Sequence, residues 1–230
     1  RSSDLAKHRE RDTDEAFWLV FFAVHFGKHR RTGWNLSREV YRGAPGPVWT
    51  WRQIADAPDH FRRWLRQHRG NLSTNHFGNH RKYESLDADS AAGTGRVIST
   101  YIDWIRKHTN HEGLIQAAEN AVGTDSNKKF KYLFKSMKSV SRFGRTARFD
   151  YLGMLGKLGL AEIEPDSAHL TGATGPLRGA KLLFGDNISR VELDNYTLKL
   201  GEHLGLGMQV LEDALCNWQK SPNDFRAFRG

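Results

Sequence analysis

The stretch "TDEAFWLVFFAVHF" (residues 13–26) contains the longest apolar run of the chain and predicts a helix at the centre of the fold. Thr13 is a suitable N-cap residue, and the acids that follow it suit the positive end of a helix dipole. The apolar part, residues 16–26, is well short of the roughly 20 residues that a membrane-spanning helix needs. The stretch therefore predicts a core helix and no membrane span.

Apolar residues at three- and four-residue spacing recur along the chain, whereas alternating apolar and polar residues are scarce, so we expect an all-α fold. The 230 residues suffice for a single helical domain, or for two packed lobes at about 1–125 and 126–230. Glycine and proline clusters at 41–49 and 87–95 predict loops. The predicted buried stripes are Ile98, Tyr101, Ile102 and Ile105; Phe130, Leu133, Phe134 and Met137; and Met208, Leu211, Leu215 and Trp218.

The charge balance favours a polyanionic partner. Lys and Arg number 35 against 26 acids, which gives a formal net charge of +9. The segment from Lys128 to Lys157 is especially basic and contains one acid, Asp150, although a solvated helix face is an alternative explanation. The single cysteine, Cys216, excludes an intramolecular disulfide, and no signal-peptide pattern precedes the core helix, so we expect a cytoplasmic protein.

Two segments echo each other, "HFGKHRR" (25–31) and "HFGNHRK" (76–82). Their histidines are four residues apart and would share a helical face, but an internal glycine and a cationic tail disfavour a metal site. An anion site fits better, because glycine lets a backbone N–H approach a phosphate and the flanking cations donate charged hydrogen bonds. Surface helix ends are the remaining alternative. The residues concerned are His25, His29, His76 and His80, with Arg30, Arg31, Arg81 and Lys82.

In "SRFGRTARFDYLGMLGKLG" (141–159), Arg142, Arg145 and Arg148 are spaced three apart and would rise along one side of a helix. Guanidinium groups in that arrangement suit successive phosphates or a pyrophosphate, since each can make bidentate contacts. A solvated arginine face is the competing account.

The segment "LTGATGPLRGAKLLF" (170–184) predicts a glycine-containing hairpin that is followed directly by a helix. Such a turn exposes backbone N–H groups that can hold a DNA phosphate, although a plain Gly-Pro turn explains it equally well. The pattern is similar to the hairpin of helix-hairpin-helix DNA glycosylases, with one extra residue. The predicted DNA-binding residues are Gly172, Thr174, Gly175, Arg178 and Gly179, together with Lys157.

In "MQVLEDALCNWQKSP" (208–222), Glu212 and Asp213 form an acid pair close to Asn217, Trp218 and Gln219. The last three are suited to reading a base edge and stacking on a base. The alternative is an ordinary solvated acid pair with Trp218 on the apolar stripe of the helix.

Several segments together resemble the alpha-glutamyl/putrescinyl thymine pyrophosphorylase family, also described as amino acid:DNA transferases, which occurs in phages with hypermodified thymine and in some bacteria. The likeness spans most of the chain. The segments are "FWLVFFAVHFGKHRR", "FGNHRKYESLDA", "SRFGRTARFDYLGMLGKLGLAEIEP", "GATGPLRGAKLLFG" and "MQVLEDALCNWQK".

The resemblance implies a helical fold related to helix-hairpin-helix DNA glycosylases. It also implies a reaction on double-stranded DNA in which pyrophosphorylated 5-hydroxymethyluracil loses pyrophosphate to an amine. The amine would come from an amino acid such as glycine or glutamate, or from putrescine. No cofactor is implied, with Mg²⁺ assistance to pyrophosphate departure left open, as are the donor, the general base and the oligomeric state.

Under this interpretation the target base must leave the stack, the pyrophosphate needs cations, and the amine needs a base. The candidates are His80, Glu212 and Asp213 for catalysis; Arg81, Lys82, Arg142, Arg145 and Arg148 for the pyrophosphate; and Tyr83, Trp218, Asn217 and Gln219 for base stacking.

Two other functions remain open at this point. A monofunctional DNA glycosylase would use a carboxylate after the hairpin, for which Asp186 and Asp194 are available, while Arg178 in the hairpin cannot form a Schiff base. A non-catalytic DNA-binding protein would need only the positive charge and the basic segment.

Overall fold

The computed structural model describes residues 2–224, and within that range it contains α-helices, short 3-10 helices and no strand. The predicted all-α class is therefore confirmed for the described part of the chain. The helices are α1 (Ser2–Phe26), α2 (Asn35–Arg42), α3 (Trp51–Asp56), α4 (Pro58–Leu72), η1 (Asn79–Arg81), α5 (Thr94–Arg106), α6 (His111–Val122), α7 (Ser126–Ser136), η2 (Met137–Ser139), α8 (Arg145–Lys157), α9 (Gly175–Phe184), α10 (Arg190–Leu204) and α11 (Met208–Trp218).

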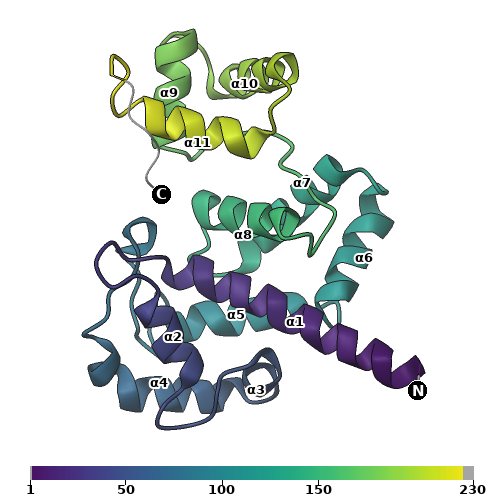
Figure 1. Cartoon of the computed structure of the whole chain (residues 1–230), viewed down its shortest axis with the longest axis vertical. Coiled ribbons are helices and arrows are strands. Elements are labelled where there is room, and N and C mark those ends of the chain that lie inside the picture. The colour runs from purple at the N-terminus through teal and green to yellow at the C-terminus, as the bar shows by residue number, and fades with distance from the viewer. Residues whose placement is uncertain (1, 225–230) are drawn as a thin grey trace.

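Helix α1 crosses the larger, N-terminal part of the molecule and packs against α8 and α6 (Figure 1). Phe17, Trp18 and Phe21 are completely buried, and the Phe21 ring stacks on Tyr101 with centroids 3.7 Å apart. The expected N-cap role of Thr13 is wrong, because α1 begins earlier in the chain and Thr13 lies inside it. Among residues 2–224 no helix is both long enough and apolar enough to span a membrane.

The three predicted apolar stripes are confirmed as buried helix faces, with Trp218 as the exception. Every stripe residue of α5, α7–η2 and α11 except Trp218 is buried, whereas Trp218 is 38 % exposed. Lys129 is also buried, which the charge pattern of α7 did not predict. The two glycine- and proline-rich segments form the loop after α2 and the loop that precedes α5, as expected.

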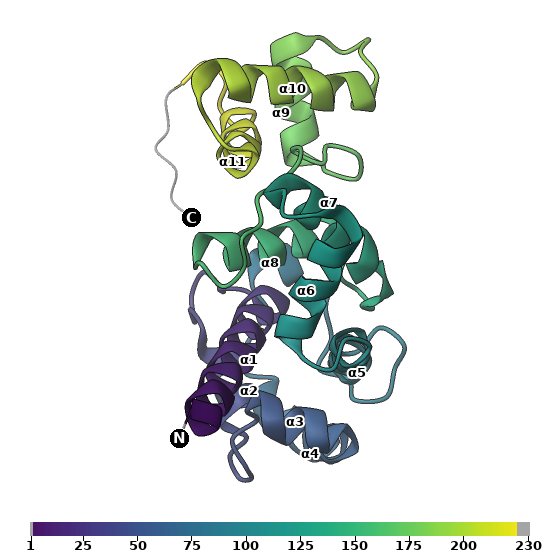
Figure 2. The ribbon, with the colours of Figure 1, turned by 90° about the vertical axis from the view of Figure 1, so that its right-hand side faces the viewer.

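Helices α9, α10 and α11 form a smaller lobe that lies on α8 at the end of the molecule away from α3 and α4 (Figures 1 and 2). Its own buried cluster is small and separate from the main core. The two clusters divide between Ile163 and Ala168, and the lobe boundary expected at about 125 stays a prediction. The cluster residues of the small lobe are Ala168, Leu170, Ala180, Leu193 and Leu215.

Two glycines of α9 allow it to lie close against α11. A Cβ atom on Gly175 would lie 2.6 Å from the Cys216 sulfur, and one on Gly179 would lie 2.3 Å from the Leu215 carbonyl oxygen. Both distances are shorter than van der Waals contact allows. Gly175 and Gly179 therefore present their Cα atoms to α11, and the DNA-binding role expected of their backbone N–H groups stays a prediction.

Candidate active site between the two lobes

Arg145, in the first turn of α8, joins the two lobes. Its guanidinium donates hydrogen bonds to the carboxylate of Glu212 on α11, at 2.5 Å, and to the carbonyl oxygens of Ala168 and His169 in the connecting segment. Both charged side chains are about nine-tenths buried, with 6 % and 10 % exposed. The Arg145–Glu212 ion pair therefore fixes α11 and the interlobe segment on the start of α8.

Three carboxyl groups gather beside this ion pair, from Asp150, Glu212 and Asp213. Burial, reinforced by the negative charges of Glu212 and Asp213, raises the pKa of Asp150 to about 7, although Arg145 and Arg81 oppose the shift. Burial also raises the pKa values of Glu212 and Asp213, and Arg145 offsets this only in part. A carboxyl group that titrates near neutrality can take up a proton at physiological pH.

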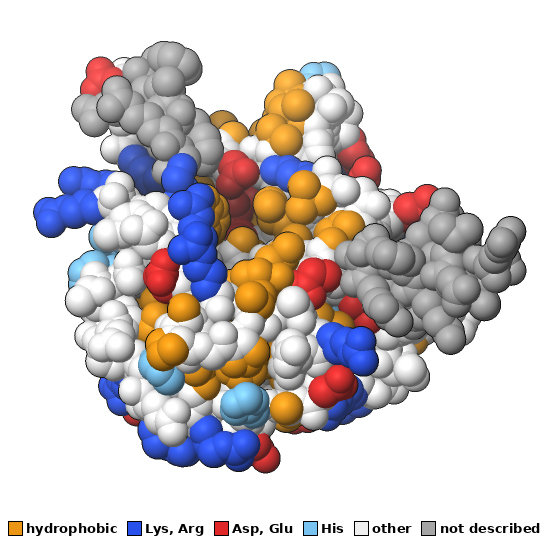
Figure 3. Space-filling view, turned by 60° about the horizontal axis from the view of Figure 1, so that its bottom comes forward, with side chains coloured by type: hydrophobic (Ala, Val, Ile, Leu, Met, Phe, Trp, Pro, Cys, Tyr) orange, Lys and Arg blue, Asp and Glu red, His pale blue; other side chains and the backbone are white. Residues whose placement is uncertain are grey.

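His80 and Lys157 lie close enough to the acids to influence them. The His80 charge lowers the pKa values of Glu212 and Asp213, and Lys157 lowers that of Asp213. The structure thus brings together His80, Glu212 and Asp213, the residues predicted to be catalytic, although they are far apart in the sequence. Figure 3 shows acidic side chains at the bottom of a hollow with Lys and Arg side chains along one side.

A cavity of about 520 Å³ opens at the N-terminus of α8, where no side chain caps the helix. Uncapped backbone N–H groups and the helix dipole favour an anion at such a position. Arg81 and Arg145 line this cavity and also lower the pKa of Asp150, so the cavity adjoins the carboxyl cluster. The cationic residues of the lining are Arg81, Lys138, Arg142 and Arg145, against one acid, Glu84.

The predicted row of three arginines on one helical face is wrong for Arg142, because α8 begins only at Arg145. Arg142 lies in the preceding turn with a positive φ of 61°, and its guanidinium contacts Glu84 and the Tyr83 carbonyl oxygen at 3.3 Å. Its side chain remains 38 % exposed. Arg142 is therefore held at the cavity and is accessible to a ligand.

Arg148 and Arg81 are bound mainly to protein groups. Arg148 donates to the Phe134 carbonyl at 2.8 Å and lies over the Phe134 ring. Arg81 donates to the His25 carbonyl at 3.1 Å and to the Arg142 carbonyl at 3.3 Å, and burial lowers its pKa. Arg148 does not line the cavity, whereas Arg81 contributes charge to its wall.

The two echoing segments pack against each other. The Gly78 N–H donates to the Phe26 carbonyl at 2.7 Å, and a Cβ atom on Gly78 would lie 2.7 Å from the carbonyl carbon of Gly27. The glycines thus allow backbone to meet backbone, and the Gly78 N–H is bonded to the Phe26 carbonyl oxygen. The contact places η1, with His80 and Arg81, against the end of α1.

The expected helical spacing of the histidines is also wrong, because His29 follows the end of α1 and His76 precedes η1. His25 is fully buried, contacts the Thr94 hydroxyl at 3.0 Å, and has a pKa well below the usual value owing to burial. Within residues 2–224, no group of at least three His, Cys, Asp or Glu side chains has a geometry that could hold a metal ion.

The segment 170–174 makes a turn and α9 follows it, so the predicted turn-then-helix order is confirmed. No helix precedes the turn directly, because α8 ends at Lys157. Gly172 has a φ of +86° and lines the cavity at the α8 N-terminus beside Arg145. The Thr174 side chain does not cap α9, and Arg178 is exposed on that helix. Gly172, Thr174, Arg178 and Lys157 thus remain available to a ligand.

The residues predicted to stack on bases lie at the two sides of the site. Tyr83 is 80 % exposed just after η1, and Trp218 is 38 % exposed at the end of α11. Asn217 and Gln219 are partly buried, and the Gln219 amide donates to the Cys216 carbonyl at 3.2 Å.

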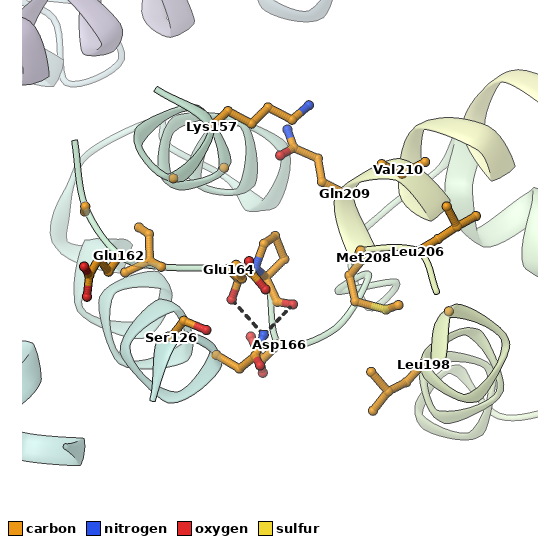
Figure 4. Close-up of a pocket in the computed structure, with 18 of the residues that line it drawn as sticks. Ser126, Lys157, Glu162, Glu164, Asp166, Leu198, Leu206, Met208, Gln209 and Val210 are labelled. Atoms are coloured by element: carbon orange, nitrogen blue, oxygen red, sulfur yellow. Dashed lines mark hydrogen bonds between the residues drawn. The ribbon is translucent and has the colours of Figure 1, made fainter. Parts of the chain in front are cut away.

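A second cavity, of about 1030 Å³, lies between the lobes along the end of α8 (Figure 4). Gln209, Met208 and Val210 of α11 face it from one side, and Lys157 and Ser126 from the other. Lys157 connects this cavity to the carboxyl cluster through its effect on Asp213. The charged residues of the lining are Glu162, Glu164, Asp166 and Glu202, against Lys157.

Residues 4–230 match the family model described as alpha-glutamyl/putrescinyl thymine pyrophosphorylase clade 3. The chain belongs to this family. A member of the thymine pyrophosphorylase family is an enzyme that acts on modified thymine in DNA, which confirms the function predicted from the resemblance. Neither the search of curated proteins nor the search of solved structures found a match to this family member.

In this thymine pyrophosphorylase, the acids that a glycosylase would use after the hairpin are engaged elsewhere. Asp194 accepts hydrogen bonds from the Leu170 N–H at 3.0 and 3.1 Å. Asp186 is exposed and lies 3.7 Å from the Lys181 ammonium. Neither arrangement places a free carboxylate beside the cationic cavity.

Sequence reasoning missed Asp150 and Lys138 as site residues. Asp150 was noted as the single acid of the basic segment, and nothing in its local sequence shows that Glu212 and Asp213 of α11 lie near enough to raise its pKa. Lys138, in η2, was not among the predicted site residues, although it lines the cavity. One signal for Asp150 was present, because it is the single acid in a strongly basic segment.

Proposed function

We propose that the protein displaces pyrophosphate from pyrophosphorylated 5-hydroxymethyluracil in DNA with an amine nucleophile. The observation that carries this proposal is the juxtaposition of the cationic cavity at the α8 N-terminus with the carboxyl cluster, in which Glu212 is buried, Asp150 is partly buried and Asp213 is exposed. A leaving pyrophosphate needs the cations of the cavity, and an amine that must lose a proton needs a carboxylate of the cluster. Arg81 and Arg145 line the cavity and also act on the charge of Asp150.

In the proposed reaction the amine nitrogen forms a bond to the exocyclic methylene carbon of the base. The carbon–oxygen bond breaks, and pyrophosphate leaves with the electron pair. Arg142, Lys138 and the backbone N–H groups at the start of α8 stabilise the charge that develops on it. Asp150, as a carboxylate, accepts the proton that the amine nitrogen releases, while Glu212, Asp213 and His80 set the charge around it.

Replacement of Arg142 by alanine should lower kcat/KM by about 10- to 100-fold, because a charged donor to the pyrophosphate is lost. The Arg142 side chain is 38 % exposed but pairs with the nearly buried carboxylate of Glu84, so a loss of about 1 kcal/mol should also lower the melting temperature by about 2–4 °C. Steady-state release of pyrophosphate from substrate DNA measures the first effect, and thermal unfolding measures the second.

The matched control for Arg142 is Arg52→Ala, since the Arg52 side chain is 77 % exposed on α3 and its ion-pair partner, Asp56, is also exposed. Unchanged turnover in Arg142→Ala would contradict the pyrophosphate site. We also propose that the protein cations act without Mg²⁺, and the same assays with and without EDTA test this.

We propose that the target nucleotide leaves double-stranded DNA and enters the site beside the carboxyl cluster and the cationic cavity at the α8 N-terminus. Extruding a base costs a few kcal/mol, which aromatic stacking and phosphate contacts can offset. Trp218 supplies a stacking surface at the end of α11, with Asn217 and Gln219 beside it. Gly172, Thr174, Arg178 and Lys157 would contact the DNA backbone, and such a substrate places the reaction in the cytoplasm of a bacterium or phage-infected cell.

The second cavity is our candidate for the amine co-substrate. Its lining carries more carboxylates than cations, which favours a donor with an additional positive charge, such as a polyamine, over an acidic amino acid. Lys157, which lines this cavity, lowers the pKa of Asp213, so a donor bound there would approach the carboxyl cluster past Lys157.

The variant Glu202→Gln should raise the KM for putrescine by about 2- to 5-fold and leave kcat unchanged, because one partly solvated charge contact is lost. Initial rates at varied putrescine and at varied glutamate measure this effect, with Asp103→Asn on α5 as a control on an exposed acid far from the cavity. If glutamate is used more efficiently than putrescine, the donor assignment is wrong.

Nucleoside mass spectrometry on DNA that carries pyrophosphorylated 5-hydroxymethyluracil tests the reaction itself. After incubation with the protein and a mixture of amino acids and polyamines, we expect a mass gain equal to one amine together with released pyrophosphate. Abasic sites would instead indicate a glycosylase, and bound but unchanged DNA would indicate a non-catalytic binding protein.

A further inference from the structure

Tyr83 stands out because its ring is 80 % exposed, more than any other large apolar or aromatic side chain among the described residues with recorded exposure. Exposed aromatic rings of this size commonly mark contact sites, since the ring gains most when a partner covers it. The Lys82 ammonium lies 4.9 Å from the ring centroid and so accompanies the ring outward.

The exposure of Tyr83 does not come from a loosely held backbone. Arg142 donates to the Tyr83 carbonyl oxygen at 3.3 Å. The following residue, Glu84, has a nearly buried carboxylate that lies 3.3 Å from Arg142 and 3.7 Å from Arg81. Since Arg81 is itself bonded to the His25 carbonyl at the end of α1, the peptide that carries the ring is fixed from two directions.

The chain neighbours of Tyr83 line two cationic cavities, since Lys82 lines one of them and Glu84 lines both. One is the cavity of about 520 Å³ at the start of α8. The other, of about 390 Å³, is lined on its cationic side by Arg69 and Lys82 together with His29 and His76, whose rings lie 5.3 Å apart. A ridge with an aromatic tip and positive charge on both flanks matches a nucleotide strand, in which bases alternate with phosphates along the backbone.

We propose that Tyr83 inserts into the base stack of duplex DNA and fills the space left by the extruded thymine. The two cavities hold the backbone phosphates on either side of it. This inference rests on the proposed function for the identity of the extruded base. The inserted ring restores the stacking that the neighbouring bases lose, which keeps the duplex open while the reaction proceeds.

The test compares duplex and single-stranded DNA. Tyr83→Ala should lower kcat/KM on the duplex by about 10- to 100-fold, and the loss on a single strand should be at least about fivefold smaller, because the ring can stack there on a base but has no duplex to hold open. Tyr83→Phe, which keeps the ring, should match the wild type on both. Equal losses on both substrates, or no loss on the duplex, would overturn the proposal.

A fluorescence measurement separates this inference from the reaction. A duplex with 2-aminopurine in place of the target thymine should brighten when the wild type and Tyr83→Phe bind, because the extruded base leaves the stack, and should stay dark with Tyr83→Ala at equal occupancy. Brightening that is the same in all three variants would refute the insertion, whereas absent turnover in the mass-spectrometry experiment would refute only the proposed reaction.

Discussion

The variant Asp150→Asn should lose about 100- to 1,000-fold in kcat, because an amide cannot accept the proton that the attacking amine releases. The asparagine has nearly the same shape as the aspartate, so the hydrogen-bonded surroundings from Arg145 and α11 should persist. Single-turnover formation of the modified nucleoside, measured at saturating amine, reports this loss without interference from product release.

The pH dependence provides a second readout of Asp150. With a pKa of about 7, the carboxyl group is mostly protonated at pH 6 and mostly ionised at pH 8, so kcat of the wild type should rise about tenfold per pH unit below pH 7 and level off above it. Glu212→Gln removes a negative charge that helps to raise the pKa of Asp150, so the rise of kcat with pH should occur at lower pH in this variant. A profile that is the same in the wild type and in Asp150→Asn would refute the assignment.

Stability distinguishes loss of chemistry from loss of fold. Because the pKa of Asp150 is higher in the folded protein than the usual 3.8, its ionisation destabilises the folded state, with the full cost present above about pH 7 and removed as the pH falls toward 4. Asp150→Asn should therefore increase the free energy of unfolding by about 2–4 kcal/mol at pH 8 and change it little at pH 4. A variant that is more stable and yet inactive would show that Asp150 serves the reaction.

Replacement of Arg145 by alanine should destabilise the protein by about 3–5 kcal/mol, the second large effect that we expect. The change leaves the buried Glu212 carboxylate unpaired and removes the donor to the carbonyl oxygens of Ala168 and His169. For a chain of this length the melting temperature should fall by about 6–20 °C. Urea and thermal unfolding curves measure the change.

The double variant Arg145→Met with Glu212→Leu provides the comparison for this prediction. Removing both charges leaves no unpaired ion, so the double variant should be more stable than Arg145→Ala and should recover about half or more of the loss. A single Arg145→Ala variant as stable as the wild type would mean that the ion pair does not hold the lobes together.

The sequence predicted the helices better than it predicted the site. Stripes such as Ile98–Ile105 and Phe130–Met137 give a local period that burial follows directly. The Arg142 prediction failed because a helix start depends on the turn before it, and the positive φ of Arg142 is not visible in the arginine spacing.

The site was only partly predictable because its residues meet through tertiary packing. Glu212 and Asp213 were identified as an acid pair, yet their pairing with Arg145 and their effect on Asp150 depend on how α11 lies on α8. Likewise, the similarity of the two HFG segments was visible and suggested an anion site, whereas in the structure Gly27 and Gly78 pack against each other.

The small C-terminal core has a consequence for how this part of the chain folds. Five buried cluster residues are too few to keep three helices folded by themselves, so the lobe depends on its contacts with α8 and with the connecting segment. It should therefore open and close as one cooperative unit, a foldon less stable than the main core. Substrate bound between the lobes would shift that local equilibrium toward the closed state, so that recognition of the modified base and completion of the fold are thermodynamically linked.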